Sequence, residues 1–377
     1  MHDQTPDALE IELLPARHGD AVLLTWGPEG DRHRLLVDGG PARAYTEVGA
    51  RLKEVAGQGD LELLVLTHID ADHIEGTILL TNDADVGIGI GEIWFNGPGQ
   101  LSHELSAAQG EMFAALVGAR AIPFNTSFDG RAVRVPEQGP LPCRKIHGLT
   151  LTVLGPDVAS LRRLRDSWNS TLDDEGLIFD SPEAALAELR RRRSLTPDDP
   201  YMGAPDDRDA TWVSELASAY AQPDDSVPNA SSIALLAEYA GASVLLTGDA
   251  TLPALTAGLQ RLLDERCLKR LELSALKMPH HGSVRNVSLD LLRMAPARAY
   301  LFSSNGSGFG HPDQAGVARV LTHGAQGAEL VFNYRSPQTL FWNDEKLLSG
   351  RHVRYPAPGA EGIRWPLPPV AADVGPS

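Results

Sequence analysis

A continuous apolar run, LELLVL at residues 61–66, leads almost directly into the polar hexapeptide HIDADH at residues 68–73. An apolar run without polar alternation predicts a strand that is covered on both of its faces. The hexapeptide is therefore expected at the end of a buried strand.

The segments around this run predict strands that alternate with helices, the pattern of an α/β protein. We expect pairs of strands at 9–27 and 231–249, single strands at 34–40 and 273–283, and helices at 44–59 and 253–270. Three regions follow from this pattern. They are a domain over residues 1–355, a mainly helical insertion within it at about 156–228, and a proline-rich irregular tail at 356–377.

Composition excludes several classes of protein. The formal net charge of -17 argues against a protein that coats nucleic acid with a broad basic surface. It does not exclude an enzyme that acts on a phosphodiester, because bound cations can reverse the field inside one acidic cleft. No run resembles a signal peptide or a membrane span, and Cys143 and Cys267 form no CxxC zinc motif. A cytoplasmic protein without a membrane partner is the simplest expectation.

The hexapeptide HIDADH places four metal-ligand side chains within six residues. An irregular loop between a strand and a helix can aim all of them at one point. Imidazole and carboxylate groups suit Zn²⁺, Mn²⁺ or Fe²⁺. The alternative is a polar helix N-terminus, in which Asp72 caps the helix and His73 has no ligand role.

At this point the chain resembles the metallo-β-lactamase superfamily, whose signature HxHxDH follows a buried strand. LLVDGG ends with Asp38, LLTGDA places Asp249 at the position of the metal-bridging aspartate, and KMPHHGS places His281 at that of the last metal-binding histidine. The resemblance covers about residues 9–345 without the insertion. It implies a four-layer αββα sandwich and a metal-dependent hydrolase that uses a metal-activated hydroxide.

Within the superfamily, the chain is most similar to the hydrolase domain of bacterial DNA-uptake channel proteins of the ComEC type and to its free-standing soluble relatives. The shared motifs are HxDxDH, an Asn-x-x-Ser at 229–232, GDA, PHHGS, and a GHP at 310–312. A role as an uptake channel is not implied, because the chain has no membrane segments.

The resemblance implies two divalent metal ions, zinc or manganese, with iron as a further option. The two ions would share one carboxylate, and Asp72 would also orient the nucleophile. The implied ligands are His68, Asp70 and Asp249 for the first ion, and Asp72, His73, His281 and the shared Asp249 for the second.

The sequence departs from the wider superfamily at the first ion. Asp70 replaces the second histidine, and no clear HxxGH-type histidine lies between HIDADH and GDA. His147 is the nearest, but a turn before a strand explains it equally well. Asn229 could supply an amide oxygen or could cap a turn. More oxygen ligands favour a harder ion, so Mn²⁺ becomes a rival of Zn²⁺, and the first site could be weak or empty.

His280 and His281 are neighbours, and neighbouring side chains on a strand point to opposite faces. We therefore expect only one of the two to bind metal. The resemblance implies that this is His281, which occupies the place of the histidine in the family's PGHG turn, whereas His280 would stabilise an oxyanion or protonate a leaving group. His311 has the same expected role, with a loop histidine beside a proline as the alternative. Asp20 and Asp38 are expected to support the site rather than to bind metal.

Two clusters of arginines, at 162–165 and 190–193, stand out in this acidic chain. Guanidinium groups match phosphate oxygens, so these arginines could grip phosphates that enter the site. The alternative is a solvated helix face paired with Asp166 and Glu188. The arginines are Arg162, Arg163, Arg165 and residues 190–193.

These features favour a phosphodiesterase or nuclease, with a phosphate-containing small molecule or a nucleic acid as substrate. A hydrolase of carboxylic esters, thioesters or lactones is the alternative, and an apolar, narrow pocket without arginines would favour it. A non-catalytic binding protein that retains the fold is the third option. The sequence does not indicate an oligomeric state.

Overall fold

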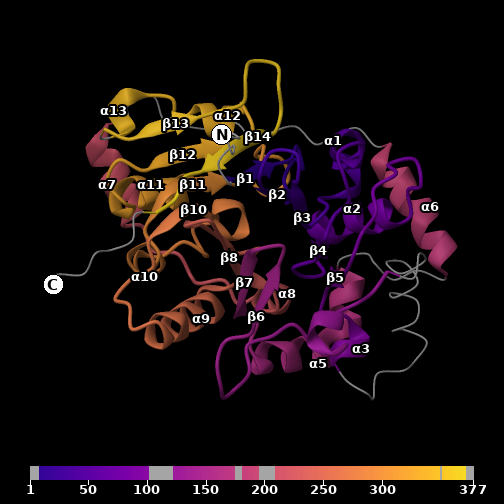
Figure 1. Cartoon of the computed structure of the whole chain (residues 1–377). Coiled ribbons are helices and arrows are strands. Elements are labelled where there is room, and N and C mark those ends of the chain that lie inside the picture. The colour runs from indigo at the N-terminus through magenta and orange to yellow at the C-terminus, as the bar shows by residue number, and fades with distance from the viewer. Residues whose placement is uncertain (1–7, 102–121, 175–180, 195–208, 349, 371–377) are drawn as a thin grey trace, which may run out of the picture.

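The computed structural model describes residues 8–101, 122–174, 181–194, 209–348 and 350–370. Two β-sheets lie face to face, with helices on the outer face of each (Figure 1). The first sheet has six strands, in the order β14 (Ile363–Leu367), β1 (Ala8–Leu13), β2 (Val22–Gly27), β3 (His33–Val37), β4 (Leu63–Val65) and β5 (Ile93–Trp94).

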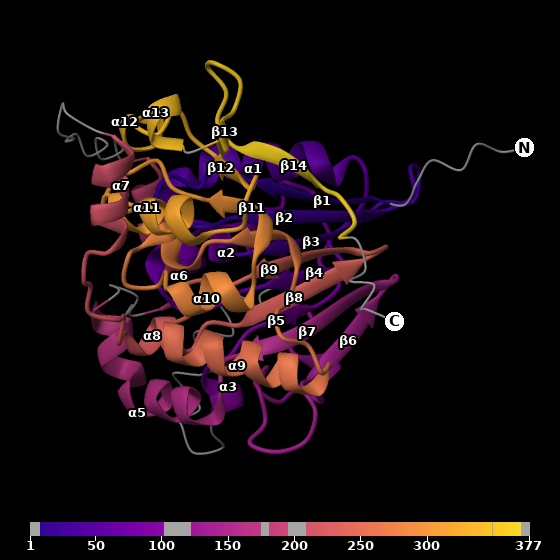
Figure 2. The same cartoon turned by 90° about the vertical axis from the view of Figure 1, so that its left-hand side faces the viewer.

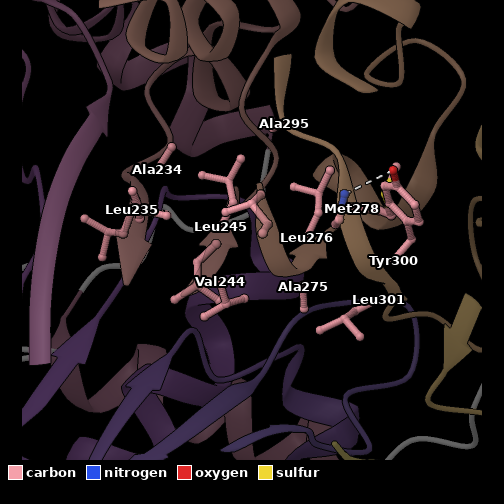
Figure 3. Close-up of a cluster of buried hydrophobic side chains, with 14 of the residues drawn as sticks. Ala234, Leu235, Val244, Leu245, Ala275, Leu276, Met278, Ala295, Tyr300 and Leu301 are labelled. Atoms are coloured by element: carbon pink, nitrogen blue, oxygen red, sulfur yellow. Dashed lines mark hydrogen bonds between the residues drawn. The ribbon is translucent and has the colours of Figure 1, made fainter. Parts of the chain in front are cut away.

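The second sheet has eight strands, and its central members run parallel to one another. Its core contains aliphatic side chains from β8 to β11 (Figure 3). The order is β13 (His352–Arg354), β12 (Glu329–Phe332), β11 (Ala297–Phe302), β10 (Leu273–Lys277), β9 (Ala242–Leu246), β8 (Ala234–Tyr239), β7 (Leu149–Gly155) and β6 (Cys143–Ile146).

Strand β4 is buried on both faces, as its apolar run predicts. Leu63 and Val65 belong to the core between the two sheets, whereas Leu64 belongs to the core between the first sheet and its helices. Strand β4 pairs in parallel with β3 on one side and β5 on the other. A central parallel strand must be apolar on both faces because layers cover it from both sides.

The outer layers complete the fold. Helices α1 (Tyr45–Ala56) and α2 (Ala71–Thr81) pack on the first sheet through Val48, Leu52 and Ile78. Helices α9 (Leu252–Glu265), α10 (Leu289–Met294) and α11 (Gln314–His323) cover the second sheet. This is the expected four-layer αββα sandwich, so the predicted fold class is confirmed (Figures 1 and 2).

The described part of residues 156–228 is mainly helical but does not form a separate body. Helix α6 (Pro182–Arg193) packs on α2. Helix α7 (Ala210–Ala217) packs on α11 at the opposite side of the molecule (Figure 1). Residues 175–180 and 195–208 lie outside the described part. The helices of this region are α5 (Val158–Asp174), α6 (Pro182–Arg193), α7 (Ala210–Ala217) and α8 (Val227–Ala230).

Short helices connect the larger elements. They are η1 (Ala42–Ala44), α3 (Pro98–Leu101), η2 (Thr126–Phe128), η3 (Pro279–Gly282), α12 (Pro337–Leu340) and α13 (Glu345–Leu348).

The C-terminal segment differs from its prediction. Residues 356–377 were expected to be irregular, but β14 at Ile363–Leu367 pairs antiparallel with β1. Its side chains alternate between partly buried and exposed, and Leu367 joins the core. The prolines obscured this strand in the sequence, and β14 is an edge strand, where proline is tolerated. Residues 371–377 lie outside the described part.

None of the described helices is both long enough and apolar enough to span a bilayer.

Candidate metal centre

Polar side chains of the predicted site follow the carboxyl ends of strands in both sheets. His68 follows β4, Asp249 follows β9, and His281 follows β10. Gly248, which has a φ of 50°, permits this convergence, because a Cβ there would lie 3.0 Å from the Thr67 side chain. The two sheets therefore bring the three motifs to one edge of the sandwich.

The hexapeptide does not act as a helix cap. Helix α2 begins at Ala71, so Asp70 rather than Asp72 is in the N-cap position, and its side chain makes no capping hydrogen bond. Its Oδ1 atom is buried and has no hydrogen-bond partner among the described residues. The capping alternative therefore does not account for the aspartates of HIDADH.

The four side chains assigned to the second ion lie close to one another. His73 Nε2 lies 3.3 Å from Asp249 Oδ2 and 3.8 Å from Asp72 Oδ2. His281 Nε2 lies 3.2 Å from Asp72 Oδ2 and 3.4 Å from Asp249 Oδ2. Ligand atoms about 2.0–2.1 Å from a tetrahedral zinc ion lie about 3.3 Å apart. The four side chains assigned to the second ion thus fit one cation.

The side chains assigned to the first ion lie next to this group. His68 Nε2 lies 3.3 Å from Asp70 Oδ2, and His68, His73 and Asp249 offer ligand atoms within 4.8 Å of one another. Asp249 therefore adjoins both groups and can bridge them. The structure brings together all six residues predicted as metal ligands.

Hydrogen bonds fix which nitrogen of each imidazole faces the centre. Asp38 accepts hydrogen bonds at 2.8 Å from His73 Nδ1, from the Thr67 amide and from the Thr67 hydroxyl. Because the Thr67 hydroxyl hydrogen is used there, His68 Nδ1 must donate to Thr67 Oγ1, at 2.9 Å. His281 Nδ1 donates to the Ser303 carbonyl at 3.1 Å. Each Nε2 atom is thereby left to face a carboxylate of the centre, Asp70 for His68 and Asp249 for His73 and His281.

Buried atoms without hydrogen-bond partners mark the same point. A buried polar atom without a partner is costly, so a cluster of them indicates a ligand that the side chains are built to hold. In the described part of the chain, such atoms include His68 Nε2, Asp70 Oδ1, His73 Nε2, Asp249 Oδ1 and His281 Nε2. Imidazole nitrogen and carboxylate oxygen are the donors that Zn²⁺, Mn²⁺ and Fe²⁺ accept.

Charges at the centre shift the pKa values in opposite directions. Burial alone would lower the pKa of His73, but the charges of Asp249 and Asp72 raise it well above its ordinary value. Burial likewise opposes the charge of Asp249, but His281 and His73 hold its pKa well below the ordinary range. The carboxylates therefore attract positive charge, either as protons on the imidazoles or as a cation between them.

Asp20 supports the centre from behind. It accepts hydrogen bonds from Lys277 Nζ and Ser303 Oγ, and its Oδ1 lies 3.3 Å from His281 Nδ1. Burial alone would raise the pKa of Asp20, but the charges of Lys277 and His281 hold it well below the ordinary range. Its oxygens are engaged, which agrees with a supporting rather than a metal-binding role. Lys277 was missed, although a lysine in the apolar run LSALKM signals a buried partner.

The prediction that the side chains of His280 and His281 point to opposite faces, as in a strand, is wrong. The two residues are not in a strand: they have φ values of 49° and 52° in the turn η3, so both side chains can face the same carboxylate. His280 Nε2 lies 3.8 Å from Asp249 Oδ2. His280 thus reaches the edge of the centre at the Asp249 carboxylate.

A polar network that the sequence did not reveal holds His280. Asp224 Oδ2 accepts hydrogen bonds from Asn229 Nδ2 at 2.7 Å and Asn286 Nδ2 at 2.9 Å, and it lies 3.5 Å from His280 Nδ1. Asn229 Oδ1 is buried without a hydrogen-bond partner among the described residues, as an amide-oxygen ligand would require. Burial opposes the charge of Asp224, but hydrogen bonds from His280 and Asn229 hold its pKa well below the ordinary range.

His311 lies against the two histidines of η3. Its ring centroid is 5.0 Å from that of His280 and 6.3 Å from that of His281. Its Nδ1 lies 3.3 Å from Asp313 Oδ1, which leaves Nε2 for a substrate or a proton transfer. The structure thus places His311 beside the centre. His147 lies elsewhere, next to His33 and Glu62.

A pocket of about 420 Å³ opens beside Asp72. Arg191 and Arg192 reach it from α6, and Arg43, His18 and Phe309 line it as well. Carboxylates accompany the α6 arginines. Glu188 binds Arg191 through two hydrogen bonds of 2.7 Å, and Arg192 pairs with Glu75 and Glu188.

The other arginines of the two clusters lie outside this pocket. Arg165 pairs with Asp166 at 2.7 Å, and Arg193 donates to Thr46 and stacks over the Tyr45 ring. The paired, solvated helix face therefore describes α5.

No protein-family model and no curated protein matches the chain. Three solved metallo-β-lactamases are similar to it in part. A mutant of the HARLDQ-motif enzyme from Cronobacter sakazakii is 23% identical, with a TM-score of 0.22 over 38% of this chain and 49% of that one. MIM-2 is 12% identical, with a TM-score of 0.31 over 76% and 81%. MIM-1 from Novosphingobium pentaromativorans is 16% identical, with a TM-score of 0.20 over 38% and 49%.

The matched region thus spans about half the length of the Cronobacter enzyme and of MIM-1. The αββα architecture is established by the strand order and packing of this chain itself.

Proposed function

We propose that this protein is a metal-dependent hydrolase with a centre for two divalent cations. The observation that carries the proposal is the set of buried nitrogen and oxygen atoms around Asp249 that have no hydrogen-bond partner in the described chain. Asp72, His73, Asp249 and His281 would hold one cation. His68, Asp70 and Asp249 would hold the other, with Asn229 as a further oxygen donor.

The cations would supply Lewis acidity, which lowers the pKa of a water molecule to about 7. Asp72 is the ligand that also lines the pocket, so its carboxylate is placed to orient an attacking water. His280 and His311 lie next to each other beside His281 and are suited to donate a proton to a leaving group.

The favoured substrate class is a phosphodiester, in a small molecule or a nucleic acid. Arg43, Arg191 and Arg192 at the pocket support it, because guanidinium groups match phosphate oxygens. Because the ligands of the first site include more oxygen than nitrogen atoms, this site suits Mn²⁺ as well as Zn²⁺. A hydrolase of carboxylic esters, thioesters or lactones is the second candidate, since Glu188 and Glu75 offset the charge of the α6 arginines.

Metal analysis tests the coarser proposal. Protein purified without added metal is expected to contain Zn, Mn or Fe, and Asp249→Ala is expected to lose it because the bridging carboxylate is gone. Chelation should abolish hydrolysis, and Mn²⁺ or Zn²⁺ should restore it. A wild-type protein that carries no metal and gains no activity from either ion would instead be a binding protein that retains the fold.

A substrate panel tests the finer proposal. It consists of bis-p-nitrophenyl phosphate, single-stranded DNA, RNA and a lactone, each assayed with Mn²⁺ and with Zn²⁺. Turnover of the phosphodiesters with little lactone hydrolysis is the expected result. Hydrolysis of the lactone alone would assign the centre to carbonyl substrates.

A further inference from the structure

We propose that His33, Glu62 and His147 form an additional site for a divalent transition-metal ion, which links the two sheets at the end remote from Asp249. His33 Nδ1 lies 2.8 Å from Glu62 Oε1, and His147 Nε2 lies 3.3 Å from Glu62 Oε2. All three side chains offer a ligand atom within 4.8 Å of the other two. Two imidazoles and one carboxylate are a donor set that Zn²⁺ accepts.

This cluster is separate from the centre already described. His33 begins β3 and Glu62 precedes β4, whereas Asp38 and His68 follow the opposite ends of the same two strands. Five or six residues of extended chain span about 16–20 Å, so no side chain can serve both places. A cation here would therefore be bound independently of the hydrolytic proposal.

The cluster joins parts of the molecule that are distant in sequence. His33 and Glu62 belong to the first sheet, whereas His147 lies in the turn between β6 and β7 of the second sheet. The rings of His33 and His147 stack, with centroids 3.9 Å apart and planes 10° apart. A metal ion binds in the plane of an imidazole ring, so the half-exposed His147 ring would turn out of this stack to bring its Nε2 to a cation shared with His33 and Glu62. Such a cation would link the edge of one sheet to the other.

Backbone geometry presents His147 to this cluster. Ile146 pairs with Leu149, so His147 and Gly148 form a two-residue hairpin turn, with φ values of 44° and 84°. Asn-Gly is the common choice for such a turn, because both residues must adopt a left-handed conformation. The Trp26 indole donates to the His147 carbonyl at 3.1 Å and fixes the turn against the first sheet.

The surroundings leave room for a cation and its remaining ligands. His147 is 51% exposed and Glu62 is 32% exposed, so water can complete the coordination. Asp31 Oδ1 lies 3.8 Å from His33 Nε2 and adds negative charge beside the cluster. The 2.8 Å contact of Glu62 would widen by about 0.5 Å to fit a tetrahedral ion. A partly exposed glutamate can make that shift.

The test counts zinc bound to the full chain after equilibrium dialysis against Zn²⁺ at pH 7.5. His147→Asn retains the left-handed turn because asparagine tolerates it, and Glu62→Gln retains the shape of the carboxylate. Wild-type protein is expected to bind one zinc ion more than either variant. His352→Asn, at an exposed histidine of β13, is the matched control and should bind as much zinc as the wild type.

Equal zinc content in the wild type and both variants would overturn the proposal. A second measurement reports on the site directly, through modification of histidines by diethyl pyrocarbonate and peptide mapping. Zn²⁺ is expected to protect His147 at least about tenfold in the wild type and not in Glu62→Gln. Modification of His147 at the same rate with and without Zn²⁺ would also overturn it.

Discussion

Strands β3 and β4 carry a histidine–carboxylate cluster at each end, and the two clusters differ in how their ligand atoms are satisfied. At the carboxyl ends, the His68, His73 and His281 side chains are at most 1% exposed, and their Nε2 atoms lack hydrogen-bond partners in the described chain. At the amino ends, His33 and His147 contact Glu62 directly and are partly open to water.

This difference separates a centre whose buried ligand atoms favour a bound cation from a cluster that tolerates its absence. Leaving several polar atoms buried without partners costs stability unless a ligand satisfies them. The half-exposed cluster can exchange a cation for protons and water at little cost. The same strands therefore predict a tightly held centre at one end and a weaker, exchangeable site at the other.

The largest expected effect is on kcat/KM, and it should differ between mutations at the two ends of strands β3 and β4. His281→Ala removes a ligand of the proposed hydrolytic centre and should lower kcat/KM by at least about 1,000-fold, the loss that follows when about 4 kcal/mol of transition-state stabilisation is removed. His147→Asn should leave kcat/KM within a factor of about two. Steady-state kinetics with the preferred substrate measure both. Equal losses in the two variants would contradict the separation.

The second-largest effect is expected from the ion pair between Lys277 and Asp20, which lies behind the buried centre. Lys277→Met leaves the buried Asp20 with His281 as its remaining cationic partner, and breaking a buried pair costs up to about 3–5 kcal/mol of the free energy of unfolding. Urea titration of the metal-free protein measures this change. The double variant Lys277→Met/Asp20→Asn should recover much of the loss. A loss below about 1 kcal/mol in the single variant would show that the pair does not stabilise the fold.

Asp38 offers a smaller change at the buried end. Asp38→Asn keeps every proposed ligand but weakens the acceptor that orients His73 and Thr67. Loss of such a partner typically costs about 10- to 100-fold in metal affinity. Competition with a fluorescent chelator measures the affinity. Asp31→Asn, beside His33, should leave the affinity of this centre unchanged.

The pH dependence follows from the raised pKa values of His73 and His281. Because each pKa lies above its unfolded value, the stabilisation from protonation is complete below about pH 6.5 and is lost as the pH rises through the folded value. A cation must displace these protons, so its affinity should rise up to about tenfold per pH unit for each proton. The increase in melting temperature on adding Mn²⁺ should therefore grow from pH 6 to pH 8.

His281→Ala is the control for the effect of pH on the Mn²⁺-induced rise in melting temperature. His281→Ala should remove most of the pH-dependent gain, because a ligand that titrates is gone. A gain from Mn²⁺ that is the same at pH 6 and pH 8 would show that protons and cations do not compete.

Contiguous motifs made it predictable from the sequence that these residues would lie together. HIDADH follows one buried strand, and Asp249 and His281 follow two others, so the edge where parallel strands end brings them together. The αββα layers follow from the same doubly buried strands. The resemblance to a superfamily supplied the pairing of motifs that are about 180 residues apart in the chain.

The remaining parts depend on contacts that no local pattern encodes. Asp224 and Asn286 meet at His280 only in the folded chain, and the left-handed turn at His280 and His281 overrides the alternation expected of a strand. Strand β14 forms because β1 offers it an edge, although its own composition suggests an irregular tail. Tertiary pairing decided each of these cases.

The smallest expected effect concerns the pocket arginines. Arg191 is exposed and already bound by Glu188, so Arg191→Ser should weaken phosphodiester hydrolysis by no more than about fivefold, as for an exposed ion pair. Arg165→Ser, on α5 and outside the pocket, is the matched control and should have no effect. If the arginines of α6 contact phosphate, the loss should appear in KM, grow as the ionic strength falls, and spare a lactone. An equal loss for both substrates would mean that Arg191 positions α6 and does not contact the substrate.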